Sequence, residues 1–314
     1  MSTNRYPKCL DPGDTIGVIA PSSPEQSSSL DDAVSMLENR GYRVLLGKHY
    51  NAVHNPLSYL AGCDNDKAED LHSLWQDDSV KAVFCLRGGY GALRMYPYIN
   101  ERLFTGIPKI FAGYSDITAL HLVINNHCNK ITLHSPMLVS LAKLTDESAI
   151  DTFWHLVEKK ETLGTLPADP EKMSTIVGGV VEGELAGGNL CILAHSVGSR
   201  FSPNFRGKIV LLEEVGEPVY RVDRYLTQLL NAGTLQEAAG FVVGFDTGWE
   251  QHEKGDTRYN PESIWHDRLA PLGKPLITGF PFGHEPNPLT LPLGVVSRLD
   301  ANERTLTLLE PAAC

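Results

Sequence analysis

Apolar runs that alternate with segments of helical periodicity constrain the fold of this chain more than any other feature. Residues 13–20 form an apolar run typical of a buried strand, residues 30–40 carry apolar side chains at helical spacing, and residues 42–47 form a second strand-like run. The connection between the two runs is too long for a hairpin. The sequence therefore predicts a parallel strand–helix–strand unit at the start of the chain.

The same alternation continues to about residue 138. It predicts helices at 66–78, 91–101 and 116–127, and strands at 80–86, 108–114 and 130–138. Polar or glycine-rich segments follow these strands, and open parallel sheets bind their ligands at the carboxyl ends of strands. We therefore expect a flavodoxin- or Rossmann-like α/β domain over residues 1–145, with its functional groups at that edge of the sheet.

The character of the chain changes between residues 146 and 175. A helical piece at 146–160 leads into a segment rich in proline and polar residues, and we interpret the whole of 146–175 as a linker between domains. Beyond it, the pattern predicts strands at 207–214, 238–245 and 274–280, a helix at 220–233 and a hairpin around 300–302. Residues 176–314 are therefore expected to form a smaller C-terminal α/β domain.

Composition disfavours several classes of protein. The 314 residues carry a formal net charge of −11 and no run rich in lysine or arginine, so nucleic-acid binding is not expected. No apolar stretch reaches about 18 residues, and the N-terminus has none of signal-peptide length. The six cysteines form no Cys-x-x-Cys pair, and the histidines show no metal-ligand spacing. We expect a cytoplasmic protein with no metal, cofactor or membrane partner.

Ser115 stands between a predicted strand and a predicted helix, in the sequence Gly-Tyr-Ser-Asp. A sharp turn at this point would expose its hydroxyl above the sheet, and the N-terminus of the helix would favour a developing oxyanion. The motif differs from the Gly-x-Ser-x-Gly elbow of the α/β-hydrolases. On the local sequence alone, a serine that caps the helix is favoured over a nucleophile.

The segment Arg87–Gly91 has three glycines at the end of a predicted strand. Glycines there allow the backbone to approach a ligand closely and to point N–H groups at it. An oxyanion hole, a phosphate cradle and a simple tight turn are all open interpretations. The segment matches neither the P-loop nor the Gly-x-Gly-x-x-Gly pattern, which weakens the case for a nucleotide-binding enzyme.

His284 lies in a loop after a predicted strand, where an imidazole can act as a general base. Glu213 and Glu214 end the strand predicted at 207–214, and a carboxylate there could orient the histidine. Each of these residues also has a structural interpretation, as an exposed loop histidine and as solvated acids at a strand end. A two-domain binding protein without catalytic activity is therefore a competing class.

Six motifs follow one another from about residue 13 to residue 300. They are GDTIGVIAPSSP, RGGYGALR, GYSD, GGNL, LLEEVGEPVYRVDR and GFPFGHEPNPLTLPLG. Together they resemble the LD-carboxypeptidases of serine peptidase family S66. The resemblance implies a catalytic triad of Ser115, Glu213 and His284, an oxyanion hole made by the backbone N–H groups of Gly89 and Asp116, and an active site between two α/β domains.

The resemblance also implies an activity. Members of the family remove the terminal D-alanine of cytoplasmic murein tetrapeptides during cell-wall recycling, need no metal and usually form homodimers. A related branch resists microcin C by cleaving an amide bond of an adenylate-like toxin. For the free carboxylate of a murein peptide we expect Arg87 or Arg224 as the donor. The other candidate substrate-binding residues are Gly88, Tyr90 and Asn189.

Overall fold

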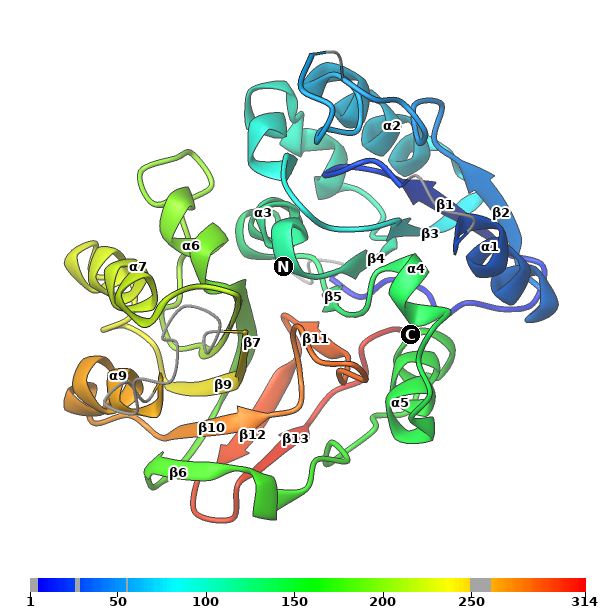
Figure 1. Ribbon diagram of the computed structural model, residues 1–314. Helices are drawn as coiled ribbons and strands as arrows, with labels where there is room; N and C mark the ends of the chain where they lie inside the picture. The colour runs from blue at the N-terminus through cyan, green and yellow to red at the C-terminus, as the bar shows by residue number, and fades with distance from the viewer. Residues whose placement is uncertain (1–4, 26–28, 55, 249–260) are drawn as a thin grey trace.

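Two β-sheets with helices packed against them form the framework of the molecule (Figure 1). The structure is a computed structural model, and it describes residues 5–25, 29–54, 56–248 and 261–314. Within these residues the first sheet has six strands and the second has seven. The expected α/β class is confirmed, although the second sheet is not the smaller of the two in strand number.

The first sheet is parallel except for one edge strand. Its strands from one edge to the other are β11 (Leu291–Leu293), β5 (Thr132–His134), β4 (Ile110–Gly113), β3 (Val80–Cys85), β1 (Thr15–Ile19) and β2 (Arg43–Leu46). Strands β1 and β2 pair in parallel with α1 (Ser29–Asn39) between them in the chain, which confirms the predicted strand–helix–strand unit. Strand β11 comes from the far end of the sequence and pairs antiparallel with β5.

Burial on both faces explains the composition of these strands. All side chains of β1 and β4 are buried, which is the pattern of a parallel sheet covered on both sides. Other helical elements of this half are α2 (Asp64–Gln76), α4 (Leu138–Leu141) and the 3-10 helices η1 (Ala92–Tyr98) and η2 (Glu101–Thr105). The strand predicted at 130–138 is shorter than expected, because the chain leaves β5 after His134 and enters α4 at Leu138.

The helix predicted at 116–127 is divided into three pieces. A 3-10 turn η3 (Ser115–Ile117) leads into α3 (Thr118–His121), and a π-helical segment η4 (Leu122–His127) follows. The π-helical turn is wider than an α-helical one, as shown by the hydrogen bond that the Cys128 N–H donates to the Val123 carbonyl, five residues back, at 2.9 Å. Such turns are uncommon and occur often near functional sites.

The second sheet combines a parallel centre with antiparallel edges. Its strands in order are β13 (Thr305–Leu308), β12 (Val296–Asp300), β7 (Val180–Asn189), β8 (Ile209–Val215), β9 (Gly240–Thr247), β10 (Leu276–Phe280) and β6 (Ser174–Val177). Strands β7 to β10 are parallel, and the hairpin predicted around 300–302 is confirmed by the antiparallel β12–β13 pair. Helices α6 (Leu190–Ser196), α7 (Val219–Asn231) and α9 (Pro261–Arg268) lie together on one side of this sheet (Figure 1).

The two halves share one apolar core. Helix α5 (Glu147–Glu158), in the segment predicted as a linker, packs its Phe153 ring edge-on against Phe84 of β3, with 5.7 Å between the centroids. The same buried cluster includes Leu185 of β7 and Leu291 of β11. The two regions of the chain therefore pack as one body, and the domain boundaries stay a prediction. After α5 the chain also forms the short 3-10 helix η5 (Pro170–Lys172), and a second one, η6 (Ala270–Leu272), follows α9.

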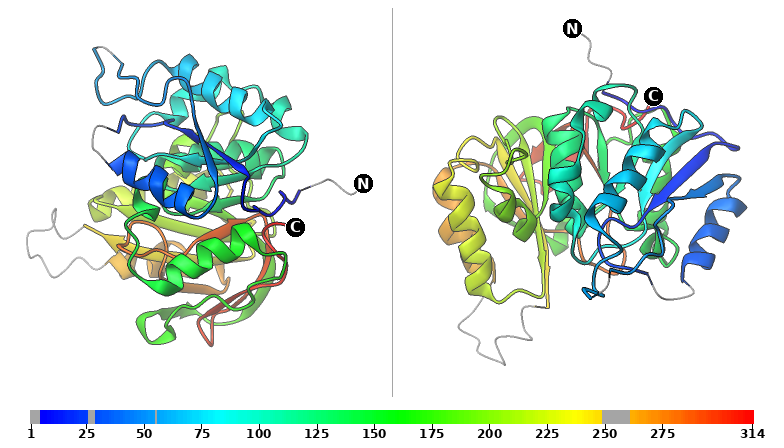
Figure 2. Two further views of the ribbon diagram at one scale, coloured as in Figure 1. Left: turned by 90° about the vertical axis from the view of Figure 1, so that its right-hand side faces the viewer. Right: turned by 90° about the horizontal axis from the view of Figure 1, so that it is seen from above.

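The ends of the described chain lie beside each other on this body (Figure 2). The Cys314 N–H donates to the Pro7 carbonyl at 2.9 Å, and the Cys9 N–H donates to the Cys314 carbonyl at 3.3 Å. Among the described residues, no helix has the length and apolar character needed to span a membrane.

Gly187 offers a test of the β7–β8 packing. Its φ is +119°, and a Cβ there would lie 2.1 Å from the Leu211 carbonyl oxygen across the parallel pair. Gly198 also has a positive φ, +85°, but nothing lies within 4 Å of where its Cβ would be. We expect Gly198→Ala to lower the free energy of unfolding by about 1 kcal/mol and Gly187→Ala by roughly 3 kcal/mol or more, measured by urea denaturation. Equal losses would contradict this packing.

Candidate active site

A cavity of about 420 Å³ opens at the carboxyl edge of the first sheet. Its lining comes from the segments that follow β1, β3, β4 and β5, and from His284 in the loop after β10. This is the edge at which the sequence predicted the functional groups, since the carboxyl ends of parallel strands meet there. The contribution of His284 from the other half of the chain makes the cavity a joint feature of both sheets.

Ser115 holds a strained backbone conformation at the end of β4. Its φ is +61°, a left-handed value that is uncommon for residues other than glycine and is often found at functional sites. The helix-cap interpretation is wrong, because the residue at the cap of η3 is Tyr114 and no side chain caps this turn. The turn instead places the Ser115 hydroxyl in the lining of the cavity.

Ser115, His284 and Glu213 form a continuous hydrogen-bonded relay. His284 Nε2 lies 2.9 Å from Ser115 Oγ, and His284 Nδ1 lies 2.6 Å from Glu213 Oε2. An ionised carboxylate can only accept, so Nδ1–H donates to Glu213. In the neutral ring Nε2 is then the acceptor for the Ser115 hydroxyl proton. This is the orientation that a general base needs.

Glu213 reaches the histidine from the centre of the second sheet. The β8–β9 register shifts between Leu212 and Glu214, so Glu213 lies at an irregularity of the kind that re-aims side chains near active sites. Two glycines leave space for it. A Cβ at Gly283 would lie 2.8 Å from Glu213 Oε2, and a Cβ at Gly244 would lie 3.2 Å from Glu213 Cβ. The loop that carries His284 can therefore close over the carboxylate.

Charge pairing dominates the protonation of this relay. Burial opposes the charged form of His284, but the charge and hydrogen bond of Glu213 outweigh it and hold the pKa of the imidazole above its ordinary value. Burial likewise opposes ionisation of Glu213, while the adjacent histidine keeps the pKa of that carboxyl below its ordinary value. The pair therefore stabilises an imidazolium, which is the form that a base adopts after it accepts the serine proton.

Glu214 has a different environment from Glu213. Its carboxylate accepts from the Cys191 N–H at 2.8 Å, the Val215 N–H at 3.0 Å and Asn189 Nδ2 at 3.2 Å. Burial raises the pKa of Glu214 to about 7, with the nearby Glu213 charge adding to the effect. Of the two acids considered from the sequence, Glu213 is therefore the one bonded to His284. Asn189, a predicted substrate-binding residue, is bonded to Glu214 and does not line the cavity.

The glycine-rich turn after β3 lies beside the serine. Gly88 and Gly89 line the cavity, and a Cβ at Gly89, whose φ is +115°, would lie 2.2 Å from Ser23 Oγ. Asp116 is buried, and its carboxylate accepts from Ser22 Oγ and the Ala92 N–H. Through these two hydrogen bonds the Asp116 side chain links the turn at Ser115 to the segments after β1 and β3 that surround the cavity. An oxyanion hole made by the backbone N–H groups of Gly89 and Asp116 stays a prediction.

The candidate substrate residues divide into two groups. Arg87 lines the cavity, where its guanidinium donates to the Pro24 carbonyl at 3.3 Å. Tyr90 is half exposed with its ring beside Tyr59, and Arg224 on α7 lies over the Tyr220 ring. Neither Tyr90 nor Arg224 lines the cavity.

The sequence missed several cavity residues, of which Lys143 is the most informative. It lies after α4, at the same edge of the sheet as Arg87, and gives the cavity a second cation. Met137 and Ser140 reach the cavity from the same stretch. The only available signal was that these residues lie at the end of a predicted strand or just after it, since no motif marks them.

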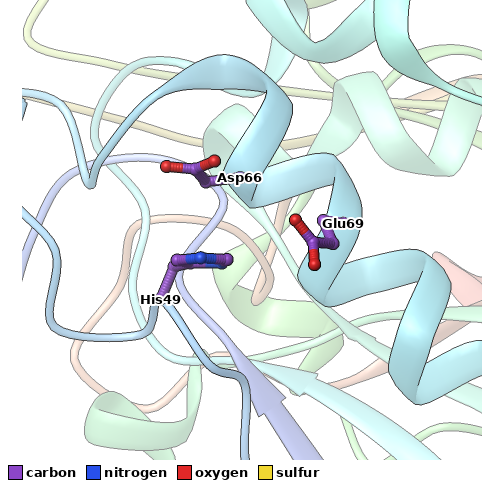
Figure 3. A group of neighbouring side chains, drawn as sticks. All are labelled: His49, Asp66 and Glu69. Carbon is purple, nitrogen blue, oxygen red and sulfur yellow. The ribbon is translucent and has the colours of Figure 1, made fainter.

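A separate group of side chains has a geometry that could hold a metal ion. His49, Asp66 and Glu69 place their ligand atoms within 4.8 Å of one another, with the two acids projecting from α2 (Figure 3). His49 Nδ1 lies 2.9 Å from an oxygen of Asp70. None of these residues lines the cavity around Ser115.

Comparisons with known proteins agree with this architecture. The model of the LD-carboxypeptidase N-terminal domain matches residues 16–135, and that of the C-terminal domain matches residues 182–299. The chain is 37% identical to the "Probable murein peptide carboxypeptidase" of Bacillus subtilis, over 98% of this chain and 95% of that protein. It is 31% identical to the murein tetrapeptide carboxypeptidase of Pseudomonas aeruginosa, over 91% and 93% of the two chains.

Among solved structures, the MccF-like protein of Bacillus anthracis superposes with a TM-score of 0.86 at 25% identity, covering 97% of this chain and 99% of that one. The fold and the comparisons together define a hydrolase of the peptidase class that is built on two β-sheets with flanking helices. The chain belongs to the LD-carboxypeptidase family, peptidase family S66.

The His284–Glu213 pairing can be tested by titration, independently of any substrate. We expect the His284 imidazole to titrate above 6.5, the ordinary value for histidine, when its ring signals are followed by NMR. Glu213→Gln removes the negative charge that offsets the effect of burial on the imidazole, so the pKa of His284 should fall. Glu237→Gln, which changes a surface carboxylate paired with Arg206, is the matched control and should leave the titration unchanged. An unchanged His284 pKa in Glu213→Gln would contradict the pairing.

Proposed function

We propose that this chain is a serine-type LD-carboxypeptidase that removes the terminal D-alanine from murein tetrapeptides during cell-wall recycling. The observation that carries the proposal is the relay from Ser115 through His284 to Glu213 at the wall of the cavity. Relatives that are named for murein peptides support the choice of substrate. A cytoplasmic location is part of the proposal, and the six free cysteines support it. A homodimer is proposed from the family resemblance alone.

The relay suggests the order of proton transfers. His284 Nε2 takes the Ser115 proton while Oγ attacks the carbonyl carbon of the scissile bond. The tetrahedral oxyanion is held by backbone N–H groups, for which Gly89 and Asp116 are the candidates. His284 then gives its proton to the leaving nitrogen, and D-alanine departs. Water, activated by the same imidazole, hydrolyses the Ser115 ester and restores the enzyme.

The charge of the cavity fits a substrate with a free carboxylate. Arg87 and Lys143 both line it, and among the described lining residues the one acid is Glu25. A carboxypeptidase must recognise the terminal carboxylate, and arginine is suited to bind it with paired N–H donors. We therefore assign the terminal carboxylate of the substrate to the part of the cavity lined by Arg87 and Lys143.

The reaction itself provides the first test. Purified protein should release D-alanine from a murein tetrapeptide, and Ser115→Ala should reduce the rate by at least about 10³-fold because the nucleophile is lost. D-alanine is measured by a coupled oxidase assay, with circular dichroism to check that the variant is folded. Wild-type turnover by Ser115→Ala would contradict the proposed nucleophile.

One alternative substrate has an observation in its favour. The MccF-like structure from Bacillus anthracis has the same fold over nearly its whole length. A microcin-type peptidase would cleave an aminoacyl sulfamoyl adenosine and leave the murein tetrapeptide intact. Measuring both substrates with the same preparation therefore separates the two functions, because Ser115→Ala should abolish whichever activity is present.

The carboxylate assignment has a matched pair of variants. Arg87→Met should raise KM for the free-acid tetrapeptide about 10- to 100-fold, because a charge-assisted hydrogen bond is lost. The KM for a peptide amidated at its C-terminus should change little. Arg224→Met is the control, since Arg224 lies outside the cavity, and should leave both values unchanged. Equal effects of Arg87→Met on the acid and the amide would contradict the assignment.

A further inference from the structure

One oxygen of the Glu213 carboxylate takes no part in the hydrogen bonds of the relay. Oε2 accepts from His284, whereas Oε1 is buried and has no hydrogen-bond partner among the described residues. The side chain is fully buried. A buried carboxylate oxygen without a donor is costly, and a carboxylate with one fixed oxygen can still rotate about its own axis. A second donor would therefore both stabilise the charge and set its plane.

A second buried polar atom without a hydrogen-bond partner among the described residues lies close to this oxygen. Nε2 of His134, the last residue of β5, lies 4.0 Å from Glu213 Oε1. It too is buried without a hydrogen-bond partner in the described part of the chain. A distance of 4.0 Å is too long for a hydrogen bond, but a small shift of either side chain would bring the two atoms into range. Two buried polar atoms of complementary kind thus lie opposite each other, one from each sheet.

The surroundings of His134 limit where its ring can turn. The ring lies edge-on to Tyr114 and Phe282, with centroid distances of 5.9 Å and 5.4 Å, and is stacked on His121 at 6.4 Å. The titratable groups around it are therefore Glu213, His284, Tyr114 and His121. Burial lowers the pKa of His134 to about 4, although the Glu213 charge opposes this. The imidazole is neutral near pH 7 and has one N–H to donate.

We propose that His134 is a positioning residue for the relay, whose Nε2–H donates to Glu213 Oε1 and holds the carboxylate in the plane that His284 requires. The relay then runs from the serine through both sheets, as Ser115, His284, Glu213 and His134. The inference rests on the proposed function of the first three residues. His134 does not line the cavity, so the proposed effect on Ser115 and His284 passes through its neighbour Glu213.

The first experiment removes the donor and then restores it. His134→Phe keeps a ring of similar size without an N–H, and it should lower kcat about 10- to 100-fold with little change in KM, as expected for loss of a hydrogen bond to a buried charge. His134→Gln places an amide N–H near the former Nε2 and should recover most of this loss. A purely structural role predicts a lower Tm in both variants and no recovery by glutamine, and that result would overturn the proposal.

A control variant addresses general disturbance of the core. Thr290, next to β11, is fully buried, and its hydroxyl has no partner among the described residues. Strand β11 pairs with β5 through Leu291 and His134. Thr290→Val removes this unpaired hydroxyl beside the same strand pair and should leave kcat unchanged. A loss in Thr290→Val as large as that in His134→Phe would assign the effect to packing and refute the positioning role.

A double variant tests whether His134 acts through Glu213. In the Glu213→Gln background, His134→Phe should have little further effect, because there is no carboxylate left to hold. The readout is the rate at which a fluorophosphonate labels Ser115, which needs no peptide substrate. If D-alanine is not released but labelling still slows in His134→Phe, the substrate proposal fails and the positioning role stands. Additive losses in the double variant would refute the positioning role.

Discussion

The buried pairing of Glu213 with His284 is the interaction on which the site depends. A carboxylate inside a protein is tolerated only when partners compensate for its lost hydration. Glu213 has such a partner at 2.6 Å, and the space for it is made by Gly244 and Gly283, where any side chain would collide with it or its neighbours. The histidine is in turn held with Nε2 toward Ser115. If the carboxylate is lost, the orientation of the His284 ring and the stability of its charged form are lost together.

The strand topology explains how residues 169 positions apart in sequence meet. Ser115 follows β4 of the first sheet, and His284 follows β10 of the second. After His284 the chain crosses back and adds β11 to the edge of the first sheet, beside β5. The loop that carries His284 is therefore anchored in both sheets at its two ends. A rigid placement of this kind is what catalysis by orientation requires.

Local patterns predicted much of the fold, and long-range packing decided the rest. The parallel strand–helix–strand unit and the hairpin around 300–302 follow from periodicity and turn residues. The burial of α5 against Phe84 does not, because a short amphipathic helix gives no sign of which sheet it will cover. The position of Lys143 does not follow either, because the strand was expected to run through residue 138. The chain instead leaves β5 after His134 and returns to the cavity through α4 and Lys143.

The site shows the same division between local and distant information. Neighbouring residues of a strand point to opposite faces, so the sequence offers Glu213 and Glu214 as equal candidates until the partner is known. The family resemblance favoured Glu213, and the structure bonds that residue to His284. Arg87 and Arg224 were likewise equal on charge alone, and only the fold separates the one in the cavity from the one on α7.

The most direct test of the account is to trap the covalent intermediate. Protein mixed with a murein tetrapeptide is quenched in acid within the first turnover, and its intact mass is measured and the modified peptide mapped. Attack by the Ser115 hydroxyl predicts a mass gain equal to the tetrapeptide minus D-alanine, located on Ser115. An adduct on another residue would contradict Ser115 as the nucleophile. So would the absence of any adduct in the wild type together with full release of D-alanine by Ser115→Ala.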